Sequence, residues 1–271
     1  MGFLKRYRDA KREKIAANRP IGGDLWEWCV SEHRIFRGMP EADMKRLRFL
    51  STIFLAEKRF VPVGEAVLDE EIKVSIAAQA CLPLLGLDMD WYNGWSTIYL
   101  TAKEYEVRNS HIDESGVVHE TDDEFAGEAF DLGPVALSKV DIEASGWGDG
   151  YNVVIHEMAH KIDGRDGSYD GCPPLPRNMD PELWHSTFGE AYANLRERLE
   201  SGSRRRGAPH GKSLRRDRTR LDPYAAESPD EFFAVCCEYF YEKPSVLIVE
   251  YPAVHERLVE FFGRDPSTWS T

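Results

Sequence analysis

Helical spacing of the hydrophobic residues is the clearest pattern along the chain. In residues 41–58, Met44, Leu47 and Phe54 fall on one face of a helix, and residues 69–85 are apolar around most of the helix circumference. The second segment is therefore expected to lie in the core. Similar patterns predict further helices at 24–30, 153–163, 180–200, 228–243 and 252–263.

Short runs of β-branched and aromatic residues between these helices predict strands. They lie at 60–63, 96–100, 104–107 and 134–140. Because the helices are longer and more numerous than the strands, we expect an α+β fold that is mostly helical. The strands would form a small mixed sheet beside the helix at 153–163.

Composition indicates where the folded region begins and ends. Residues 20–264 carry most of the predicted elements and are expected to form a single domain, with a basic arm at 1–19 and a tail at 265–271. The arm is expected to be a solvated tail or helix. Residues 201–220 are arginine-rich and nearly devoid of apolar residues, which predicts a flexible basic insertion, and residues 108–131 are expected to form a solvated acidic loop.

Charge is distributed unevenly along the 271 residues. The formal net charge of −13 argues against nucleic acid as a direct partner. Yet residues 1–19 contain seven Lys and Arg against two acids, and residues 201–220 contain eight against one. These two basic segments are candidate docking surfaces for a protein partner, although most such segments are simply solvated.

The cysteines and the apolar runs bear on cellular location. The five cysteines are odd in number and show no C-x-x-C spacing, which favours buried thiols in a reducing compartment over disulfides or a cysteine metal site. No apolar run approaches the roughly 20 residues of a membrane span, and the N-terminus lacks the features of a signal peptide. We therefore expect a cytoplasmic protein.

The helix at 153–163 contains the sequence H-E-x-x-H. Two residues four positions apart lie about 40° apart around a helix, so His156 and His160 can reach one Zn²⁺ ion. Glu157 can then meet a water molecule at the metal and act as a general base. The pattern predicts a zinc hydrolase, and the alternative is an ordinary amphipathic helix with two histidines on its polar face.

A catalytic zinc ion requires a third protein ligand. Asp166 follows the motif at a suitable distance, but the glycine that should precede it, Gly164, is one position out of register. Asp163 is better suited to orient a histidine than to bind the metal.

Glu231 is the stronger candidate, because it lies in a second, aromatic-rich helix and would complete a His₂Glu set. Its alternative role is to cap that helix together with Ser228 in a capping box. Glu227 and Glu238 remain further candidates from the sequence alone.

Four segments, at 76–81, 133–138, 154–164 and 222–240, resemble the Mlc titration factor A family of zinc peptidases. That family is similar to the catalytic domain of anthrax lethal factor, a gluzincin, so the resemblance implies a zincin-like fold. The basic stretch at 201–220 is longer than the usual connector of the family, which leaves substrate and partner choice open.

The resemblance also implies roles for individual residues. It implies that one Zn²⁺ ion is bound by His156, His160 and Glu231, with Glu157 as general base. The family places a tyrosine seven residues before the glutamate ligand, which here is Tyr224, whose hydroxyl would stabilise the oxyanion.

The implied activity is aminopeptidase-like hydrolysis of peptide substrates. The implied partner is a transcriptional repressor of the Mlc type. The alternative is a protein-binding anti-repressor module whose catalysis is vestigial or activated by the partner.

Overall fold

The computed structural model describes residues 3–102, 133–205 and 219–269. The described α-helices are α1 (Phe3–Asn18), α2 (Gly23–Glu32), α3 (Glu41–Glu57), α4 (Glu70–Ala80), α5 (Lys139–Ala144), α6 (Val153–Asp163), α7 (Pro181–Arg205), α8 (Pro229–Glu242), α9 (Pro244–Glu250) and α10 (Pro252–Phe262). The strands are β1 (Arg59–Pro62), β2 (Thr97–Thr101) and β3 (Val135–Ser138). Short 3₁₀ helices are η1 (Arg34–Phe36), η2 (Leu82–Leu84), η3 (Met89–Tyr92), η5 (Gly164–Asp166), η7 (Pro223–Ala226) and η8 (Pro266–Thr268). The α+β, mostly helical class predicted from the sequence is thus confirmed.

The three described strands form one sheet in the order β1-β2-β3. Both pairings are parallel, with Phe60 opposite Ile98 and Leu100 opposite Leu137. A mixed sheet was expected, so the described strands differ from the prediction in direction. The strand predicted at 104–107 and the acidic loop at 108–131 lie outside the described residues.

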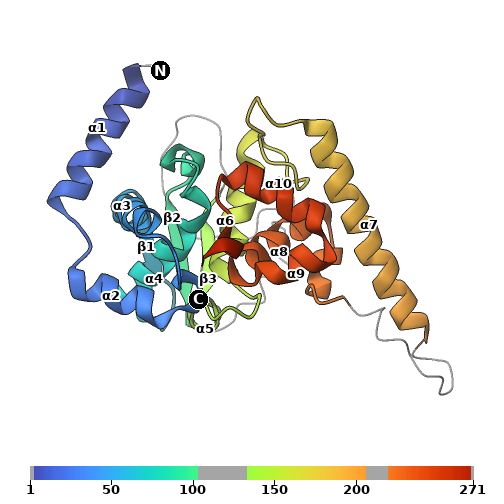
Figure 1. The fold of residues 1–271 in the computed structure, drawn as a ribbon. Helices are drawn as coiled ribbons and strands as arrows, with labels where there is room; N and C mark the ends of the chain where they lie inside the picture. The colour runs from blue at the N-terminus through green and yellow to red at the C-terminus, as the bar shows by residue number, and fades with distance from the viewer. Residues whose placement is uncertain (1–2, 103–132, 206–218, 270–271) are drawn as a thin grey trace.

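Helix α6 lies in the middle of the molecule, between the sheet and the C-terminal helices α8, α9 and α10 (Figure 1). Its apolar face is buried, with Ile155, Met158 and Ile162 fully enclosed. Helix α4 packs against α6 and is buried around most of its circumference, as its apolar sequence predicts. This packing fixes the orientation of α6, and hence the direction in which its polar face points.

Two helices were not predicted, because their first residues were interpreted as ends of other elements. Ser138 ends β3 and also caps α5, since its hydroxyl accepts a hydrogen bond from the Asp141 amide at 3.1 Å. Pro244 ends α8 and occupies the first turn of α9, where a missing amide hydrogen costs nothing. A capping serine or a proline can therefore mark a start as well as a stop.

The basic arm forms the helix α1, most of whose side chains are exposed, and one of its faces contacts the rest of the chain. Arg12 of α1 has only 7% of its side chain exposed and contacts Glu57 at 2.9 Å and Asp90 at 2.7 Å. Lys5 and Arg8, on the same face, lie 2.6 Å from Asp88 and 2.8 Å from Asp90 respectively.

The other predicted irregular segments are partly structured. Residues 201–205 continue α7 as helix, while residues 206–218 of the predicted insertion lie outside the described residues. Residues 266–268 of the predicted tail form η8. Within the described ranges, none of the helices has the length and apolar character that crossing a membrane requires.

Candidate metal centre

Helix α6 supplies two imidazoles to one site. The helix begins at Asn152, whose side chain accepts a hydrogen bond from the Ile155 amide at 2.9 Å. With its apolar face buried, the helix directs His156 and His160 to the opposite side. Their Nε2 atoms lie 3.2 Å apart, so both ring nitrogens face the same point.

Helix α8 brings a carboxylate to the same point. Ser228 caps α8 by accepting a hydrogen bond from the Glu231 amide at 3.4 Å, which is the Ser228 half of the capping box predicted from the sequence. The Glu231 carboxylate nevertheless faces the histidines. Its Oε2 atom lies 3.0 Å from Nε2 of His156 and 3.6 Å from Nε2 of His160. The amide of Glu231 is thus part of the cap, and its side chain is part of the site.

The geometry and the donor types of these three residues fit a zinc ion. One ligand atom from each of His156, His160 and Glu231 lies within 4.8 Å of the others. Oε2 of Glu231 is buried and, despite its short contact with His156, makes no well-oriented hydrogen bond. Two imidazole nitrogens and one carboxylate oxygen form a ligand set that catalytic zinc sites use.

The other candidate third ligands lie elsewhere. Asp166 accepts hydrogen bonds from Ser168 at 2.6 and 3.0 Å. Asp163 is buried and accepts a hydrogen bond from the Gly171 amide at 2.9 Å, so it supports the loop after α6. Glu227 is exposed. None of the three belongs to the group of metal-ligating atoms found among the described residues.

Electrostatic interactions couple His156, His160 and Glu231 to one another. Burial alone would lower the pKa of His156, but its close contacts with the Glu231 and Glu238 carboxylates outweigh burial and raise that pKa well above its ordinary value. Burial would raise the pKa of Glu231, but its close contacts with His156 and His160 outweigh burial and lower that pKa. Protons and a metal ion compete for these side chains, so the affinity of the site for a metal ion falls in acid.

A carboxylate that the sequence left as a competing ligand supports a histidine instead. Oε1 of Glu238 lies 2.9 Å from Nδ1 of His156, and its Oε2 accepts a hydrogen bond from the Asn152 amide at 2.5 Å. Glu238 therefore joins the start of α6 to α8. Its spacing was a usable signal, because Glu231, Glu238 and Glu242 recur at seven and four residues and so share one face of α8.

Two more residues predicted from the sequence lie at or beside this centre. The Tyr224 hydroxyl donates a hydrogen bond to Oε1 of Glu231 at 3.0 Å, and the Tyr224 ring centroid lies 6.0 Å from that of His156. Glu157 follows His156 on α6 and is half-buried. A carboxylate and a phenol are thus available close to the cluster of metal-ligating atoms.

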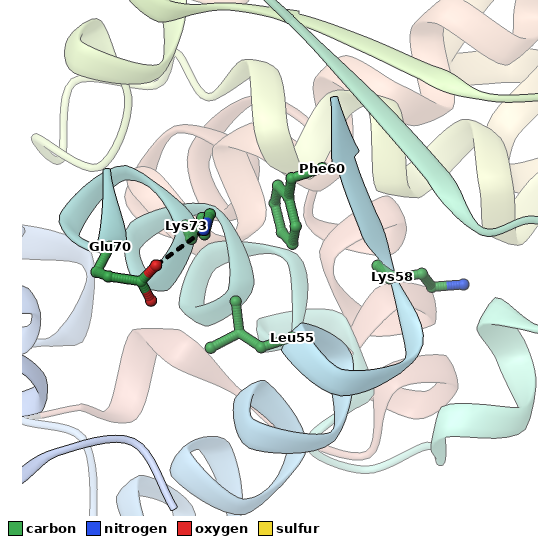
Figure 2. Close-up of a pocket in the computed structure, with 5 residues that line it drawn as sticks. All are labelled: Leu55, Lys58, Phe60, Glu70 and Lys73. Atoms are coloured by element: carbon green, nitrogen blue, oxygen red, sulfur yellow. Dashed lines mark hydrogen bonds and ion pairs between the residues drawn. The ribbon is translucent and has the colours of Figure 1, made fainter. Parts of the chain in front are cut away.

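A separate cavity of about 270 Å³ lies away from these residues, between α3, β1 and α4. Leu55, Lys58, Phe60, Glu70 and Lys73 line it. In Figure 2 the Lys58 amine points away from the paired Glu70 and Lys73. That amine donates to the carbonyls of Tyr92 and Trp95, both at 2.6 Å. Since both lysines are engaged, the cavity offers no group that indicates a ligand.

Known proteins provide an independent comparison. The family model for glucose-regulated metallo-peptidase M90 matches residues 7–263. Similar proteins include Mlc titration factor A of Cronobacter sakazakii, 30% identical over 256 residues that cover 94% of this chain and 91% of that protein. Those of Escherichia coli and Yersinia pestis are each 29% identical, over 255 and 252 residues, covering 89% and 92% of this chain and 92% and 88% of theirs. The resemblance noted in the sequence is confirmed, and the chain belongs to the glucose-regulated metallo-peptidase M90 family.

Proposed function

We propose that this chain is a zinc-dependent, aminopeptidase-like peptidase, with His156, His160 and Glu231 as the zinc ligands. The observation that carries the proposal is the convergence of two imidazole nitrogens and a buried carboxylate oxygen that lacks a well-oriented hydrogen bond. Membership of a metallo-peptidase family supports the reaction type. The peptide specificity rests on the family resemblance alone.

A zinc ion bound by these three residues would polarise a substrate carbonyl and make a water molecule more acidic. Glu157 then accepts a proton from the attacking water and delivers it to the leaving amine. The Tyr224 hydroxyl donates a hydrogen bond to the substrate oxygen on which negative charge develops. In the structure this hydroxyl donates to Oε1 of Glu231. Glu238 holds the ring of His156 through Nδ1, which would leave Nε2 free to bind the metal.

The substitution Glu157→Gln tests this mechanism. It preserves shape but removes the base, so we expect zinc content to stay at one ion per chain while kcat falls roughly 10²- to 10⁴-fold. Zinc is measured by atomic absorption and turnover on a panel of aminoacyl and peptide chromogenic substrates. The exposed Glu227→Gln is the matched control and should leave both quantities unchanged. Turnover by Glu157→Gln at the wild-type rate would rule the mechanism out.

Blocking the substrate amine separates aminopeptidase from endopeptidase activity. An aminopeptidase requires a free substrate N-terminus, so N-acetylated versions of the same substrates should not be hydrolysed. Equal hydrolysis of free and acetylated substrates would contradict the aminopeptidase-like assignment and leave peptide hydrolysis itself in place.

Binding of an Mlc-type repressor is a second proposed function, favoured by the name of the relatives, Mlc titration factor A. Binding and catalysis can occur in one chain, and the alternative is a binding module with vestigial or partner-activated catalysis. The Glu157→Gln protein should still retain an Mlc-like repressor in a pull-down. Failure of the wild-type chain to retain it would contradict the binding function. The five free cysteines support a cytoplasmic location for both functions.

A further inference from the structure

A buried carboxylate outside the metal centre connects three separate parts of the chain. Glu250 is the last residue of α9, and 8% of its side chain is exposed. Its Oε1 accepts a hydrogen bond from the Arg220 amide at 2.9 Å. Its Oε2 accepts from the Thr219 hydroxyl at 3.2 Å and from Arg198 of α7, also at 3.2 Å. One side chain thus holds α7, α9 and the segment that begins at Thr219.

That segment leads directly into η7, which carries Tyr224. Leu221 is 2% exposed, and the Arg220 carbonyl accepts a hydrogen bond from the Tyr239 hydroxyl at 3.0 Å. Asp222 then caps η7 by accepting a hydrogen bond from the Tyr224 amide at 2.9 Å. Consecutive contacts therefore run from Glu250 to the tyrosine, with no long unsupported stretch of backbone between them.

The far end of η7, at Ala226, is held by a hydrogen bond from α7 and by packing. The Tyr192 hydroxyl of α7 donates to the Ala226 carbonyl at 3.1 Å, and Ala225 is fully buried. Because the end at Ala226 is fixed, the direction of the Tyr224 side chain depends on the position of the other end of η7, which follows Arg220. Glu250 and Tyr239 both hold the end of η7 that follows Arg220, since Glu250 accepts a hydrogen bond from the Arg220 amide and Tyr239 donates one to the Arg220 carbonyl.

The chemistry at Glu250 suits positioning better than it suits stability. A buried ion pair contributes little net stability relative to apolar residues, because both charges must lose their hydration. A carboxylate that accepts from a backbone amide and a guanidinium does, however, hold those groups in one geometry. Arg198 is itself oriented by the Tyr251 hydroxyl, 3.3 Å from its Nη1 atom.

We propose that Glu250 is a positioning residue for Tyr224, setting where the tyrosine hydroxyl lies relative to the metal centre. The inference rests on the proposed function, in which Tyr224 stabilises the oxyanion. Since the hydroxyl lies 3.0 Å from Glu231, a small displacement of η7 moves it away from the reacting oxygen while the three ligand side chains stay in place. Loss of Glu250 should therefore lower kcat and leave zinc affinity and KM nearly unchanged.

A double-mutant cycle in the zinc-loaded full-length chain tests this coupling. Glu250→Ala should lower kcat on the order of 10- to 100-fold, the cost expected when a catalytic group is misplaced. Tyr224→Phe should lower kcat comparably, and Glu250→Ala should have little further effect in the Tyr224→Phe background. Equal factors in both backgrounds, or no effect of Glu250→Ala in the wild-type chain, would overturn the inference.

Two further variants separate positioning from general destabilisation. Glu250→Gln retains a carbonyl oxygen for the Arg220 amide and should restore most of kcat, which keeps the test valid if Glu250→Ala folds poorly. Asp43→Ala breaks a comparable contact, between Asp43 and Arg264 at 2.8 Å, that joins α3 to the segment after α10. It should lower the melting temperature without changing kcat. A matching loss of kcat in Asp43→Ala would mean that Glu250 acts only through stability.

A readout without catalysis distinguishes failure of this inference from failure of the proposed function. With 3-fluorotyrosine placed at position 224, the ¹⁹F resonance should shift in Glu250→Ala and stay unchanged in Asp43→Ala. If the ¹⁹F resonance shifts in Glu250→Ala but the chain hydrolyses no peptide, Glu250 positions Tyr224 and the proposed peptidase function is wrong. An unchanged resonance in Glu250→Ala would reject the positioning whatever the activity.

Discussion

The Nδ1 atom of His156 lies 2.9 Å from Oε1 of Glu238, whose other oxygen binds the amide of Asn152 at the start of the same helix. The imidazole is therefore fixed from behind, and its Nε2 atom faces His160 and Glu231. Burial raises the pKa of Glu238, and the hydrogen bonds from His156 and Asn152 counteract part of that rise. The buried carboxylate is costly to maintain, which argues that its contact with the histidine has a function.

Replacing Glu238 should weaken zinc binding without touching a ligand. We expect Glu238→Ala to lower zinc affinity on the order of 10- to 100-fold, because the His156 ring loses its orientation and some of its basicity. Affinity is measured by competition with a chromophoric chelator. The control is Glu242→Gln on the same helix. Glu242 is also buried, but it accepts a hydrogen bond from the Asn152 side chain, so this substitution should change zinc affinity little. Equal affinities for the wild-type and Glu238→Ala chains would contradict this role.

Removing the metal should destabilise the folded chain, because zinc binds the assembled site and not the separated ligands. At a zinc concentration about 1,000 times Kd the stabilisation is about 4 kcal/mol, so chelation should lower the melting temperature by roughly 10 °C. Differential scanning fluorimetry with and without chelator measures the change.

The variant Glu231→Ala identifies the ligand in the same experiment. It should respond much less to zinc than the wild-type chain does, because it retains only two of the three ligands. The exposed Glu227→Ala should respond as the wild type does. A full zinc response in Glu231→Ala would remove Glu231 from the ligand set.

The docking of α1 should depend on pH through Asp90. Burial would raise the pKa of the Asp90 carboxyl, but hydrogen bonds from Arg8 and Arg12 outweigh it and lower that pKa from 3.8 to about 2. Because the folded pKa is the lower one, the contribution to stability is complete above pH 3.8 and is lost as the pH falls toward 2. Allowing for solvent screening at a partly exposed pair, the contribution is about 1 kcal/mol.

Urea unfolding of wild-type and Asp90→Asn chains across this pH range measures the effect. The difference in their free energies of unfolding should be constant near neutral pH and shrink below about pH 4. Lys14→Ala, on an exposed part of α1, serves as the control and should show no such pH-dependent difference. A difference between wild type and Asp90→Asn that is as large at pH 2 as at neutral pH would contradict the assignment of the effect to Asp90.

Local periodicity was sufficient to predict most of the helices. The spacing of Leu47 and Phe54 in α3 and the apolar circumference of α4 correspond to their observed burial. Periodicity was insufficient where one residue ends an element and begins the next, as Ser138 and Pro244 do. Periodicity also could not predict the relative direction of the strands, because the short apolar runs do not distinguish parallel from antiparallel pairing.

The sequence was sufficient to predict that His156 and His160 of α6 lie side by side, with Glu157 next to them. A four-residue spacing places both imidazoles on one face of a helix, whatever packs around that helix. The sequence could not choose among the remaining carboxylates, since spacing along α8 defines a face but not the helix that this face meets. Only the packing of α8 against α6 placed Glu231 beside His156 and His160, and Glu238 behind His156. The contact of Glu250 with the segment before Tyr224 likewise joins residues 30 positions apart, and such contacts depend on the three-dimensional arrangement of the core.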